Sequence, residues 1–575
     1  MLLAIEFGFV LIAVALAFLS PAMGSSAFGA IEQRFAGIAE RRGLCVLAVG
    51  AMAILFRVAA LPILPVPQPR MADEFSHLLL ADTLANGRLS NPTHPMWIHF
   101  ETLHVIMRPT YASMYPPAQG FFLAVGKLIS GNPFIGVCLS TGMMCAAICW
   151  MLQAWMPPSW ALLGGLLAVM RLAVFSYWAD SYWGGAVAAT GGALVFGALG
   201  RILEKATVRD ALLMSLGILL LANSRPYEGL IFSLPVAAVL AVWLFKKRGA
   251  TLGLALRRVI VPLALASMVV ALGTGYYFWR VTGEPFRMPY QVDRSTYAVT
   301  PYFLWQTPKP LPIYREEALR QFYSKQELDF YAVSRSLTGM AAVEAVKFSH
   351  LWLFYLGPAL TLPLALSLAA APYGMPWTHL SRPVRLFLFA TLVSLAGLAL
   401  EVFFFPHYAA PITALLYGLV LLSMRSLRSW KWHGKPSGLF LSRAVPLVCV
   451  LVFALRTGAT PLRLSLGPDW PPTWYNAKAP DSGRTHIQSE LETLTGDHLV
   501  FVRYGQNSSN QSQYAWVYND ANIDQSKVVW AWDMGDSRNR ELIDYFKDRR
   551  IWLVQIDDEV PNLVPYSRAL ANREK

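Results

Sequence analysis

Charged residues are scarce in this sequence. Of its 575 residues only 14% are Asp, Glu, Lys or Arg, while 55% are hydrophobic. A soluble protein carries about 25% charged residues, so the composition excludes a chain of ordinary cytosolic domains. The mean hydropathy of +0.42 indicates one large membrane-embedded body instead. A net charge of +13 would favour nucleic acid as the partner of a soluble protein, but in a membrane protein it reflects basic cytoplasmic loops beside anionic lipid.

Cysteine is scarce too, and two common motifs are missing. The chain has no CxxC pair or Cys/His cluster, so nothing indicates structural zinc, and it has no phosphate-binding Gly-x-x-x-x-Gly-Lys-Ser/Thr loop, so nothing indicates an ATP-driven pump. Each cysteine falls inside an apolar stretch, which makes a disulfide framework in the loops improbable. The five are Cys45, Cys138, Cys145, Cys149 and Cys449.

Apolar stretches of membrane-spanning length recur along the chain and predict about twelve transmembrane helices. The first stretch has no basic segment before it and no clear small-residue cleavage site after it, so we expect a retained helix rather than a signal peptide. The expected spans are 2–20, 44–66, 133–156, 159–178, 183–201, 210–223, 226–245, 258–279, 349–371, 385–404, 408–425 and 443–458.

Basic residues collect in alternate loops, and this sets the orientation. The short connections around Ser181 and Pro406 carry no Lys or Arg. We therefore expect a bacterial-type inner membrane protein with both termini on the extracytoplasmic side, and the nucleic-acid interpretation loses its support. The loops expected in the cytoplasm hold Arg34, Arg41, Arg42, Arg201, Lys205, Arg209, Lys246, Lys247, Arg248, Arg257, Arg258, Arg425, Arg428, Lys431, Lys435 and Arg443.

Three long segments remain on the outer side, namely residues 67–132, residues 280–348 and the tail. We expect a transmembrane domain over residues 1–458 and a small extracytoplasmic α/β domain over residues 459–575. Hydrophobic periodicity predicts the elements of the tail. They are helices at 484–494 and 538–549 and strands at 499–504, 515–518, 528–532 and 551–556.

Five ionisable residues fall within the expected spans, where charge is costly and a functional role is the default hypothesis. Under the predicted topology all five lie in the outer half of the membrane, which favours a shared polar cavity that opens outward. The alternative is a set of ion pairs between helices, for example Arg171 with Glu228. The five are Arg57, Arg171, Arg225, Glu228 and Glu401.

The first outer loop begins with a predicted helix over residues 70–87. Its leucines recur at helical spacing and Gly87 supplies a stop, so we expect an amphipathic helix along the membrane surface. Asp73 and Glu74 stand at its start. Taken alone, they are typical of a helix N-cap and of a first-turn acid that the helix dipole favours.

A Pro-Pro helix start follows in the same loop. Tyr115-Pro116-Pro117-Ala118-Gln119-Gly120 precedes a second short apolar helix at 121–129. The order of one span, an Asp-Glu pair opening a helix, a Pro-Pro helix start and the next span resembles the GT-C superfamily of polyprenyl-phosphate-dependent glycosyltransferases. Within it, the resemblance is to the branch of protein O-mannosyltransferases and lipid A aminoarabinose transferases, and it covers roughly residues 44–425.

The resemblance implies a polytopic α-helical, GT-C-like fold in which an acid of the first outer loop lies beside donor and acceptor; the matching residue is Asp73. Sugar transfer from a lipid phosphate needs a base for the acceptor proton and a cationic or metal environment for the departing phosphate. We expect Asp73 to be that base and Glu74 to position it or bind acceptor. A divalent cation (Mg, Mn or Zn) could bind Asp73 and Asp180.

Later outer turns supply further candidates. Asp180 stands between aromatic residues that could stack on sugar rings, or it belongs to an interfacial aromatic belt. Arg225 offers a fork of donors suited to phosphate, with Glu228 close behind it, or it anchors at the lipid headgroups. His407 and Tyr408 resemble a basic-Tyr-x-x-Pro pattern of related transferases, although an ordinary His is mostly neutral at pH 7, which weakens a phosphate role.

Three more basic residues could bind the donor phosphate. Arg57 lies within a span, while Arg108 and Lys127 flank the second short helix and could merely contact lipid headgroups. Three histidines at intervals of five fit no familiar zinc spacing, so we expect them in a solvated loop. They are His94, His99 and His104.

Together these features predict a membrane glycosyltransferase. It would move a hexosyl or pentosyl group from a polyprenyl-phosphate donor to a glycolipid, glycan or protein acceptor on the outer face. Three alternatives remain open. An O-antigen ligase or polymerase would use His and Arg of a late outer loop, such as 280–348, in place of Asp73. A lipid or solute transporter would line its path with the intramembrane charges, and a non-catalytic envelope protein would bind partners through its tail.

Overall fold

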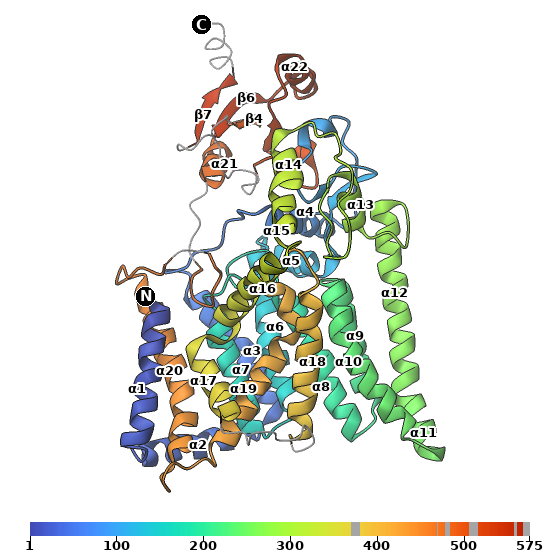
Figure 1. The fold of residues 1–575 in the computed structure, drawn as a ribbon. Coiled ribbons are helices and arrows are strands. Elements are labelled where there is room, and N and C mark those ends of the chain that lie inside the picture. Colours follow the sequence, from blue (N-terminus) through green and yellow to red (C-terminus); the bar gives the residue numbers. More distant parts are fainter. Residues whose placement is uncertain (370–379, 468–469, 478–482, 505–515, 557–560, 567–575) are drawn as a thin grey trace.

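The computed structural model describes residues 1–369, 380–467, 470–477, 483–504, 516–556 and 561–566. Figure 1 shows a bundle of long helices. At one end the bundle carries a large layer formed by the two long loops and the tail, which we call the outer layer after the expected topology. The N-terminus lies at that same end of the bundle. The short helices α2 (Ser25–Ala39) and α11 (Gly249–Ala255) lie at the opposite end, where the basic loops are.

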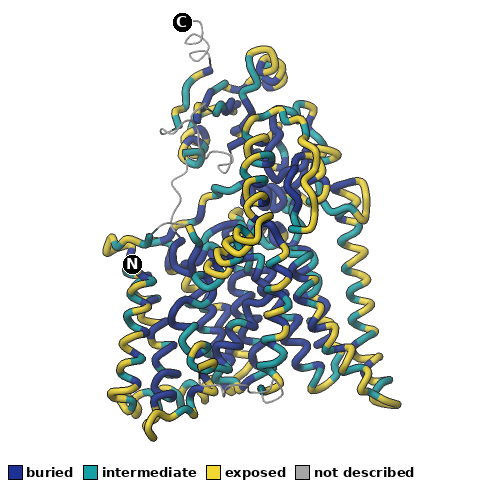
Figure 2. Tube along the Cα trace, in the orientation of Figure 1, coloured by how far each residue is buried: buried dark blue, intermediate teal, exposed yellow. Residues whose placement is uncertain are grey.

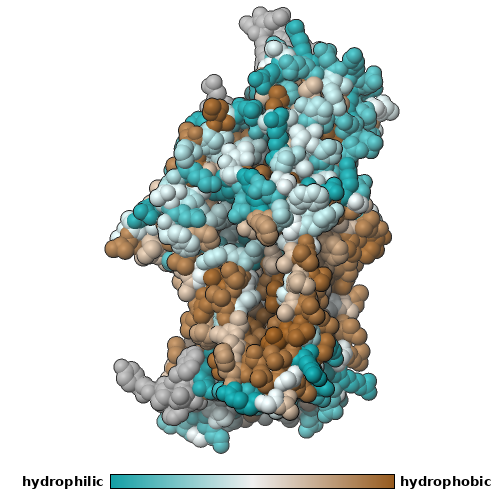
Figure 3. Space-filling view, turned by 90° about the vertical axis from the view of Figure 1, so that its right-hand side faces the viewer, coloured by the Kyte–Doolittle hydropathy of each residue, from teal (hydrophilic) through white to brown (hydrophobic). Residues whose placement is uncertain are grey.

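Nine helical segments in the described part of the chain are long and apolar enough to cross a membrane. Figure 3 shows the matching surface, an apolar band between polar regions at the two ends. The prediction of a polytopic α-helical membrane protein is therefore confirmed. The segments comprise α1 (Leu2–Leu19), α3 (Arg42–Ala59), α6 (Phe134–Leu152), α8 (Ala186–Glu204), α10 (Pro226–Phe245), α11 with α12 (Val261–Thr282), α16 (Leu337–Leu351) with α17 (Gly357–Ala369), α19 (Thr413–Leu427) with the 3-10 turn η6 before it (Pro406–Ile412), and α20 (Ser437–Ala459).

The expected number of about twelve spans stays a prediction. Each expected span contains a helix, but three of these helices are not among the nine segments, since they have only 15, 15 and 17 residues: α7 (Pro158–Leu172), α9 (Val208–Ala222) and α18 (Arg382–Leu398). They end early because the chain turns into outer connections that carry charged residues. These residues are Asp180, Arg225 and Glu401.

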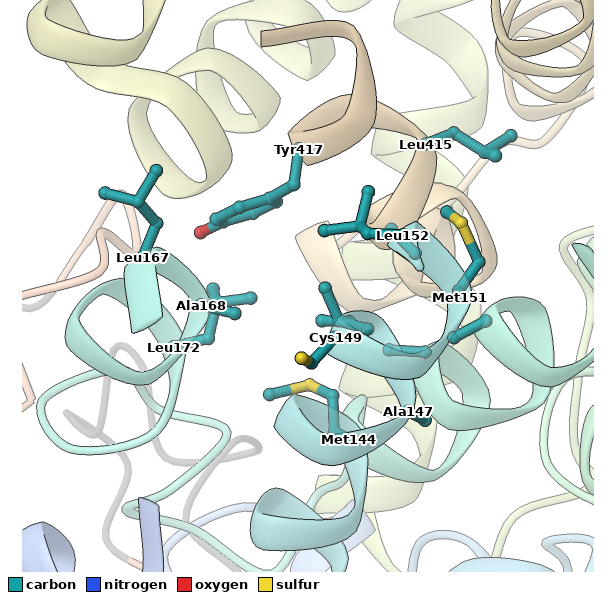
Figure 4. Packing of buried hydrophobic residues seen from close by; sticks show 14 of the residues in the cluster. Met144, Ala147, Cys149, Met151, Leu152, Leu167, Ala168, Leu172, Leu415 and Tyr417 are labelled. Carbon is teal, nitrogen blue, oxygen red and sulfur yellow. The ribbon is translucent and has the colours of Figure 1, made fainter. Parts of the chain in front are cut away.

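The centre of the bundle is closely packed. Figure 4 shows Cys149 and Leu152 of α6, Leu167 of α7 and Tyr417 of α19 meeting there, each at most 1% exposed. Lipid is as apolar as these side chains, so close packing rather than exclusion of water holds the helices together. In Figure 2 the burial falls off toward α1 and α12, which lie at the edges of the bundle.

Two glycines fix the second short helix of the first outer loop, α5 (Pro117–Ser130), against α6. A Cβ atom at Gly126 would come within 2.2 Å of the backbone nitrogen of Gly136. Only glycine permits this backbone contact. The contact also holds the segment that leads into α5, including Tyr115, at the outer end of the bundle.

The outer layer joins three separate parts of the sequence. Apolar side chains of the first outer loop, of residues 297–323 and of the tail share one buried cluster, in which Phe75 stacks on Tyr518 with ring centroids 4.6 Å apart. The remaining elements of the two loops are β1 (Asn91–Pro92), η1 (Trp97–Phe100), β2 (Val105–Ile106), β3 (Thr110–Ser113), α13 (Pro289–Thr296), α14 (Glu317–Gln321) and α15 (Glu327–Val333).

The helix that carries Asp73, α4 (Ala72–Ala85), lies inside this layer. Ten of its residues are buried, among them Phe75 and Leu79. The expectation of an amphipathic helix along the membrane surface was wrong. The reason is that the tail covers the face that we expected to meet water and headgroups.

The tail forms a four-stranded sheet in the order β5-β4-β6-β7, with β7 antiparallel to its neighbour. Both helices and three of the four strands were predicted. The fourth was wrong, because Trp516–Tyr518 form no strand; Ala515 lies outside the described residues. The Asn519 side chain accepts a hydrogen bond from the backbone amide of Trp530 (2.8 Å) and donates one to its carbonyl (2.9 Å), as the backbone of a neighbouring strand would. The elements are α21 (Gly483–Thr493), β4 (His498–Tyr504), β5 (Val528–Trp532), α22 (Asp536–Tyr545), β6 (Arg550–Ile556) and β7 (Asn562–Pro565), the last of which was missed.

Candidate active site

Glu74 fixes the start of α4. Its Oε1 accepts hydrogen bonds from the backbone amides of Arg70 (3.1 Å) and Met71 (3.3 Å), and its Oε2 accepts one from the amide of Tyr182 (3.1 Å). Burial raises the pKa of Glu74, and these hydrogen bonds oppose the rise. Glu74 thus ties α4 to the turn after α7, whereas the neighbouring Asp73 keeps a side chain that is 17% exposed.

Asp73 lies in a cluster of aromatic and histidine side chains. The hydroxyl of Tyr115 donates a hydrogen bond to Asp73 Oδ1, and His104 Nδ1 lies 3.7 Å from the same oxygen. Tyr115 Oη also lies 3.3 Å from His104 Nδ1, and its ring stacks on His77 with centroids 4.4 Å apart. The carboxylate is thereby held in place and remains partly open to solvent.

The groups around Asp73 are uncharged. Burial lowers the pKa of His77 to about 3 and also lowers the pKa of His104, while Asp73 opposes both shifts. Burial, reinforced by Asp73, raises the pKa of Tyr115 well above its usual value. These three side chains therefore act at neutral pH through hydrogen bonds and ring contacts and not through charge.

Arg225 stands on a neighbouring outer turn. The backbone amide of Ala118 at the start of α5 donates to the carbonyl of Asn223 (2.8 Å), which holds this turn beside the first outer loop. The guanidinium of Arg225 lies 4.0 Å from the ring centroid of Tyr408, and its Nη1 donates to Glu228 Oε1 (3.3 Å). The Arg225 side chain is 21% exposed.

Asp73 and Arg225 are both tied to the start of α5, because Tyr115 donates to Asp73 and the amide of Ala118 donates to the turn that carries Arg225. Burial is the largest cause of the raised pKa of Tyr115. The charge of Asp73 raises this pKa further, and the charge of Arg225 lowers it. The charge of Asp73 also reaches Tyr408, the residue beneath Arg225. The structure therefore brings together a carboxylate and a guanidinium that are far apart in the sequence, at the outer end of the bundle.

His407 lies beside this cluster in the turn η6. Its backbone amide donates to Tyr177 Oη (3.0 Å), so the hydroxyl proton of Tyr177 can be donated to His407 Nδ1, also at 3.0 Å. That arrangement places the ring proton on Nε2, which is buried and has no hydrogen-bond partner in the described part of the chain. In this form His407 is neutral, and its Nε2–H group is a donor without a partner among the described residues.

Asp180 lies apart from Asp73. Its Oδ1 accepts a hydrogen bond from Arg57 Nη2 (2.9 Å), and the two side chains are 3% and 1% exposed. Arg57 also donates to the carbonyls of Ala179, Leu64 and Pro65 at 2.9–3.2 Å. Burial raises the pKa of Asp180 to about 7, against the influence of Arg57. Both groups are engaged within the protein, so their expected roles toward substrate stay predictions.

Lys127 and Arg108 also lie away from the Asp73 cluster. Lys127 Nζ pairs with Asp82 Oδ1 (2.5 Å), and Asp82 Oδ2 accepts the amide of Ala521 from the tail (2.8 Å). Arg108 is exposed and lies over the ring of Trp97, 4.3 Å from its centroid. Their expected roles as phosphate ligands stay predictions as well.

Two other expectations were wrong. The three histidines at intervals of five do not lie in a solvated loop, since His94, His99 and His104 are at most 9% exposed. Arg171 does not pair with Glu228; its Nη2 lies 2.6 Å from Oε1 of Glu6. The first outer loop buries its histidines under the tail, and Glu6 on α1 reaches Arg171 only in the folded bundle.

The donor set does not fit the expected divalent cation between Asp73 and Asp180. Arg57 occupies Asp180, and Tyr115 and His104 surround Asp73. Among the residues that the structure describes, no three His, Cys, Asp or Glu side chains are grouped so that they could bind a metal ion.

The sequence matches no family model and no curated protein. Solved membrane transferases are similar in fold. Against the Archaeoglobus fulgidus oligosaccharyltransferase in the apo form, the TM-score is 0.45 at 9% identity, over 80% of this chain and 62% of that one. This chain thus spans less than two thirds of the length of that protein.

Two further structures show the same distant likeness. The complex of the Archaeoglobus oligosaccharyltransferase with Zn and sulfate gives a TM-score of 0.48 at 10% identity, over 89% of this chain and 67% of that one. ArnT from Cupriavidus metallidurans bound to undecaprenyl phosphate gives 0.44 at 12% identity, over 92% and 94%.

Proposed function

We propose that this protein is a membrane glycosyltransferase that moves a hexosyl or pentosyl group from a polyprenyl-phosphate donor to an acceptor at the outer face of a bacterial-type inner membrane. One observation carries the proposal. Two partly exposed side chains of opposite charge, Asp73 and Arg225, are both tied to the start of α5, the first through Tyr115 and the second through its own turn.

The chemistry of sugar transfer needs both groups. Asp73 takes the proton of the acceptor hydroxyl, whose oxygen then attacks the anomeric carbon of the donor from the face opposite the phosphate. The bond between that carbon and the phosphate oxygen breaks, and its electron pair leaves with the phosphate. Arg225 stabilises the negative charge that gathers there. A single displacement of this kind inverts the anomeric configuration.

Neighbouring residues prepare the two groups. Tyr115 and His104 hold the Asp73 carboxylate in one orientation, which reduces the entropy lost when the acceptor arrives. Glu228 neutralises Arg225 while no donor is bound, and the donor phosphate takes over part of that role. Tyr408 supports the guanidinium from below. The proposed transfer step uses only these side chains, without Mg, Mn or Zn.

The alternatives explain less of this arrangement. An O-antigen ligase would use His and Arg of residues 280–348, but that segment contains no His. Its Arg294 is bonded to both oxygens of Glu327 (2.6 and 2.9 Å) and to the carbonyl of Thr300. A transporter would not need an acid held by hydrogen bonds in the outer layer, and a purely tail-mediated scaffold would not need the Asp73 cluster at all.

Mass spectrometry of envelope lipids and glycans tests the activity. Cells that lack the protein should accumulate a polyprenyl-phosphate sugar and lose one glycan modification, and the wild-type gene should restore both. A transporter would change the distribution of a lipid between the membrane leaflets but leave every glycan mass unchanged. Identical glycans with and without the protein would contradict the proposal.

A further inference from the structure

A cleft in the outer layer, between residues 280–348 and the tail, is not used by the transfer step. It has a volume of about 430 Å³ and is lined by Arg315, Glu316, Asp533, Met534 and Arg538. This volume is in the range of small-molecule binding sites, which is about 300–1,000 Å³. Four of the five lining residues are ionisable, so the occupant must be polar.

Two acids at this cleft are already neutralised by the protein. Asp533 is paired with Arg503, and its Oδ1 accepts a hydrogen bond from Asn539 Nδ2 (2.7 Å). Glu101, behind the cleft, accepts hydrogen bonds from Arg315 Nη1 at both oxygens (3.2 Å each). Each acid thus has an arginine partner, although the charges of Glu101 and Asp533 still contribute to the raised pKa of Glu316.

Arg538 and Glu316 are the open groups of the cleft. In the described part of the chain, neither side chain has a hydrogen bond or ion pair. Burial is the largest cause that raises the pKa of Glu316 to about 8, so at neutral pH this carboxyl group mostly keeps its proton and can donate a hydrogen bond. The cleft thus places the unpaired guanidinium of Arg538 beside Glu316, a neutral hydrogen-bond donor.

One more arginine, Arg108, lies beside the lining residue Arg315. The guanidinium groups of Arg108 and Arg315 both lie over the ring of Trp97, 4.3 and 4.9 Å from its centroid. Arginine forks bind carboxylate and phosphate groups in two-point contacts. Met534 is the single apolar lining residue, so the cleft offers no pocket for the apolar side chains of a peptide.

The cleft lies in the same outer layer as Asp73 but at its far side from the bundle. Glu101, which holds Arg315, precedes His104 by three residues, so their Cα atoms are at most about 11 Å apart. In Figure 1, α14 and α22, which flank the cleft, lie at the end of the molecule remote from the bundle. Because Asp73 lies where this layer meets the bundle, an acceptor that binds in the cleft has to be long enough to span the layer, as a saccharide of several sugars is.

We propose that this cleft binds the acceptor and that the acceptor is an anionic saccharide, one that carries carboxylate or phosphate groups. The role as acceptor site rests on the proposed glycosyltransferase function; the binding of the saccharide does not. Arg538, Arg108 and Arg315 recognise its anionic groups, and Glu316 donates to a hydroxyl or anionic oxygen.

Titration of the purified full-length protein with an oligogalacturonate hexasaccharide tests the site, with maltohexaose as the neutral control. We expect the oligogalacturonate to bind and maltohexaose to bind at least tenfold more weakly. Arg538→Gln should raise the Kd about tenfold, since a hydrogen bond to a charged group contributes about 1.5–3 kcal/mol. Arg540→Gln is the matched control, because it removes an exposed arginine of the same helix that does not line the cleft.

The pH dependence gives a second measurement. Affinity should fall as the pH rises through about 8, because Glu316 then becomes negatively charged. Glu316→Gln should remove this fall. The site would be excluded if wild-type protein failed to bind oligogalacturonate, if Arg538→Gln left the Kd unchanged, or if an oligoglutamate peptide bound more tightly than the saccharide.

Asp73→Asn separates the two proposals. It should keep the Kd of wild-type protein for the oligogalacturonate while losing transfer. Absence of binding together with transfer that depends on Asp73 would overturn the cleft assignment alone. Binding at the cleft together with transfer that does not depend on Asp73 would overturn the proposed mechanism alone.

Discussion

Arg57 Nη2 lies 2.9 Å from Asp180 Oδ1, and neither side chain is more than 3% exposed. The pair joins α3 to the turn after α7, and it makes a structural test of Asp180 possible. We expect Asp180→Ala to lower the free energy of unfolding by about 3–5 kcal/mol, because it leaves a buried arginine unpaired. Thermal unfolding in detergent measures this loss.

Asp329→Asn is the control for that measurement, since Asp329 is an exposed acid of the outer layer. It should leave the unfolding temperature unchanged. If Asp180→Ala unfolded at the wild-type temperature and yet lost transfer, Asp180 would act on the substrate, as its place between aromatic residues in the sequence suggested.

Tyr115 positions the base. Tyr115→Phe removes the hydroxyl that donates to Asp73 while keeping the ring that stacks on His77. We expect kcat to fall about 10- to 100-fold, the equivalent of a hydrogen bond to a charged group. The KM for the donor should stay the same, because the donor phosphate binds at Arg225. Steady-state kinetics with Tyr276→Phe, an exposed tyrosine of α12, as the control would separate these effects. A rise in the donor KM with unchanged kcat would assign Tyr115 to donor binding instead.

The proposed function assigns the donor phosphate to Arg225. Arg225→Gln should weaken donor binding about 10- to 100-fold, because it removes a charged fork. Arg225→Lys should recover only part of the loss, since an ammonium group cannot form the two-point contact. Binding of undecaprenyl phosphate to the purified variants measures both. Equal affinity in wild type and Arg225→Gln would place the phosphate elsewhere.

Local order in the sequence was enough to predict the helix starts that carry the candidate site residues. The Asp-Glu pair, the Pro-Pro helix start and the outer turn with Arg225 are local patterns, and the structure places all three at the outer end of the bundle. The Arg57–Asp180 pair could not be predicted, because 123 positions separate the two residues and only the helix packing brings them together.

The histidines of the first outer loop show a second limit. His104 reaches Asp73 from an irregular segment in which its backbone has a positive φ of 62°. No periodicity marks such a position. The burial of α4 was missed for a related reason, because a strand and helix pattern in the tail predicts a fold for the tail but not the surface that the tail covers.

Acid should destabilise the protein through His77. The pKa of His77 is about 3 in the folded protein and about 6.5 in an unfolded chain. The unfolded state therefore binds more protons below pH 6.5, and the stability that is present above this pH is lost as the pH falls toward 3. Thermal unfolding between pH 4 and pH 7 should show a smaller loss for His77→Phe, which keeps the stacking on Tyr115. Equal losses in both proteins would show that His77 is not held neutral.

The activity of Asp73→Asn tests the central claim most directly. Wild-type protein, Asp73→Asn and Asp329→Asn would be compared at equal amounts in cells that lack the native gene, with the modified glycan measured by mass spectrometry. Wild type and Asp329→Asn should restore the modification, and Asp73→Asn should not, while it unfolds at the wild-type temperature. Full modification by folded Asp73→Asn would show that Asp73 is not the base.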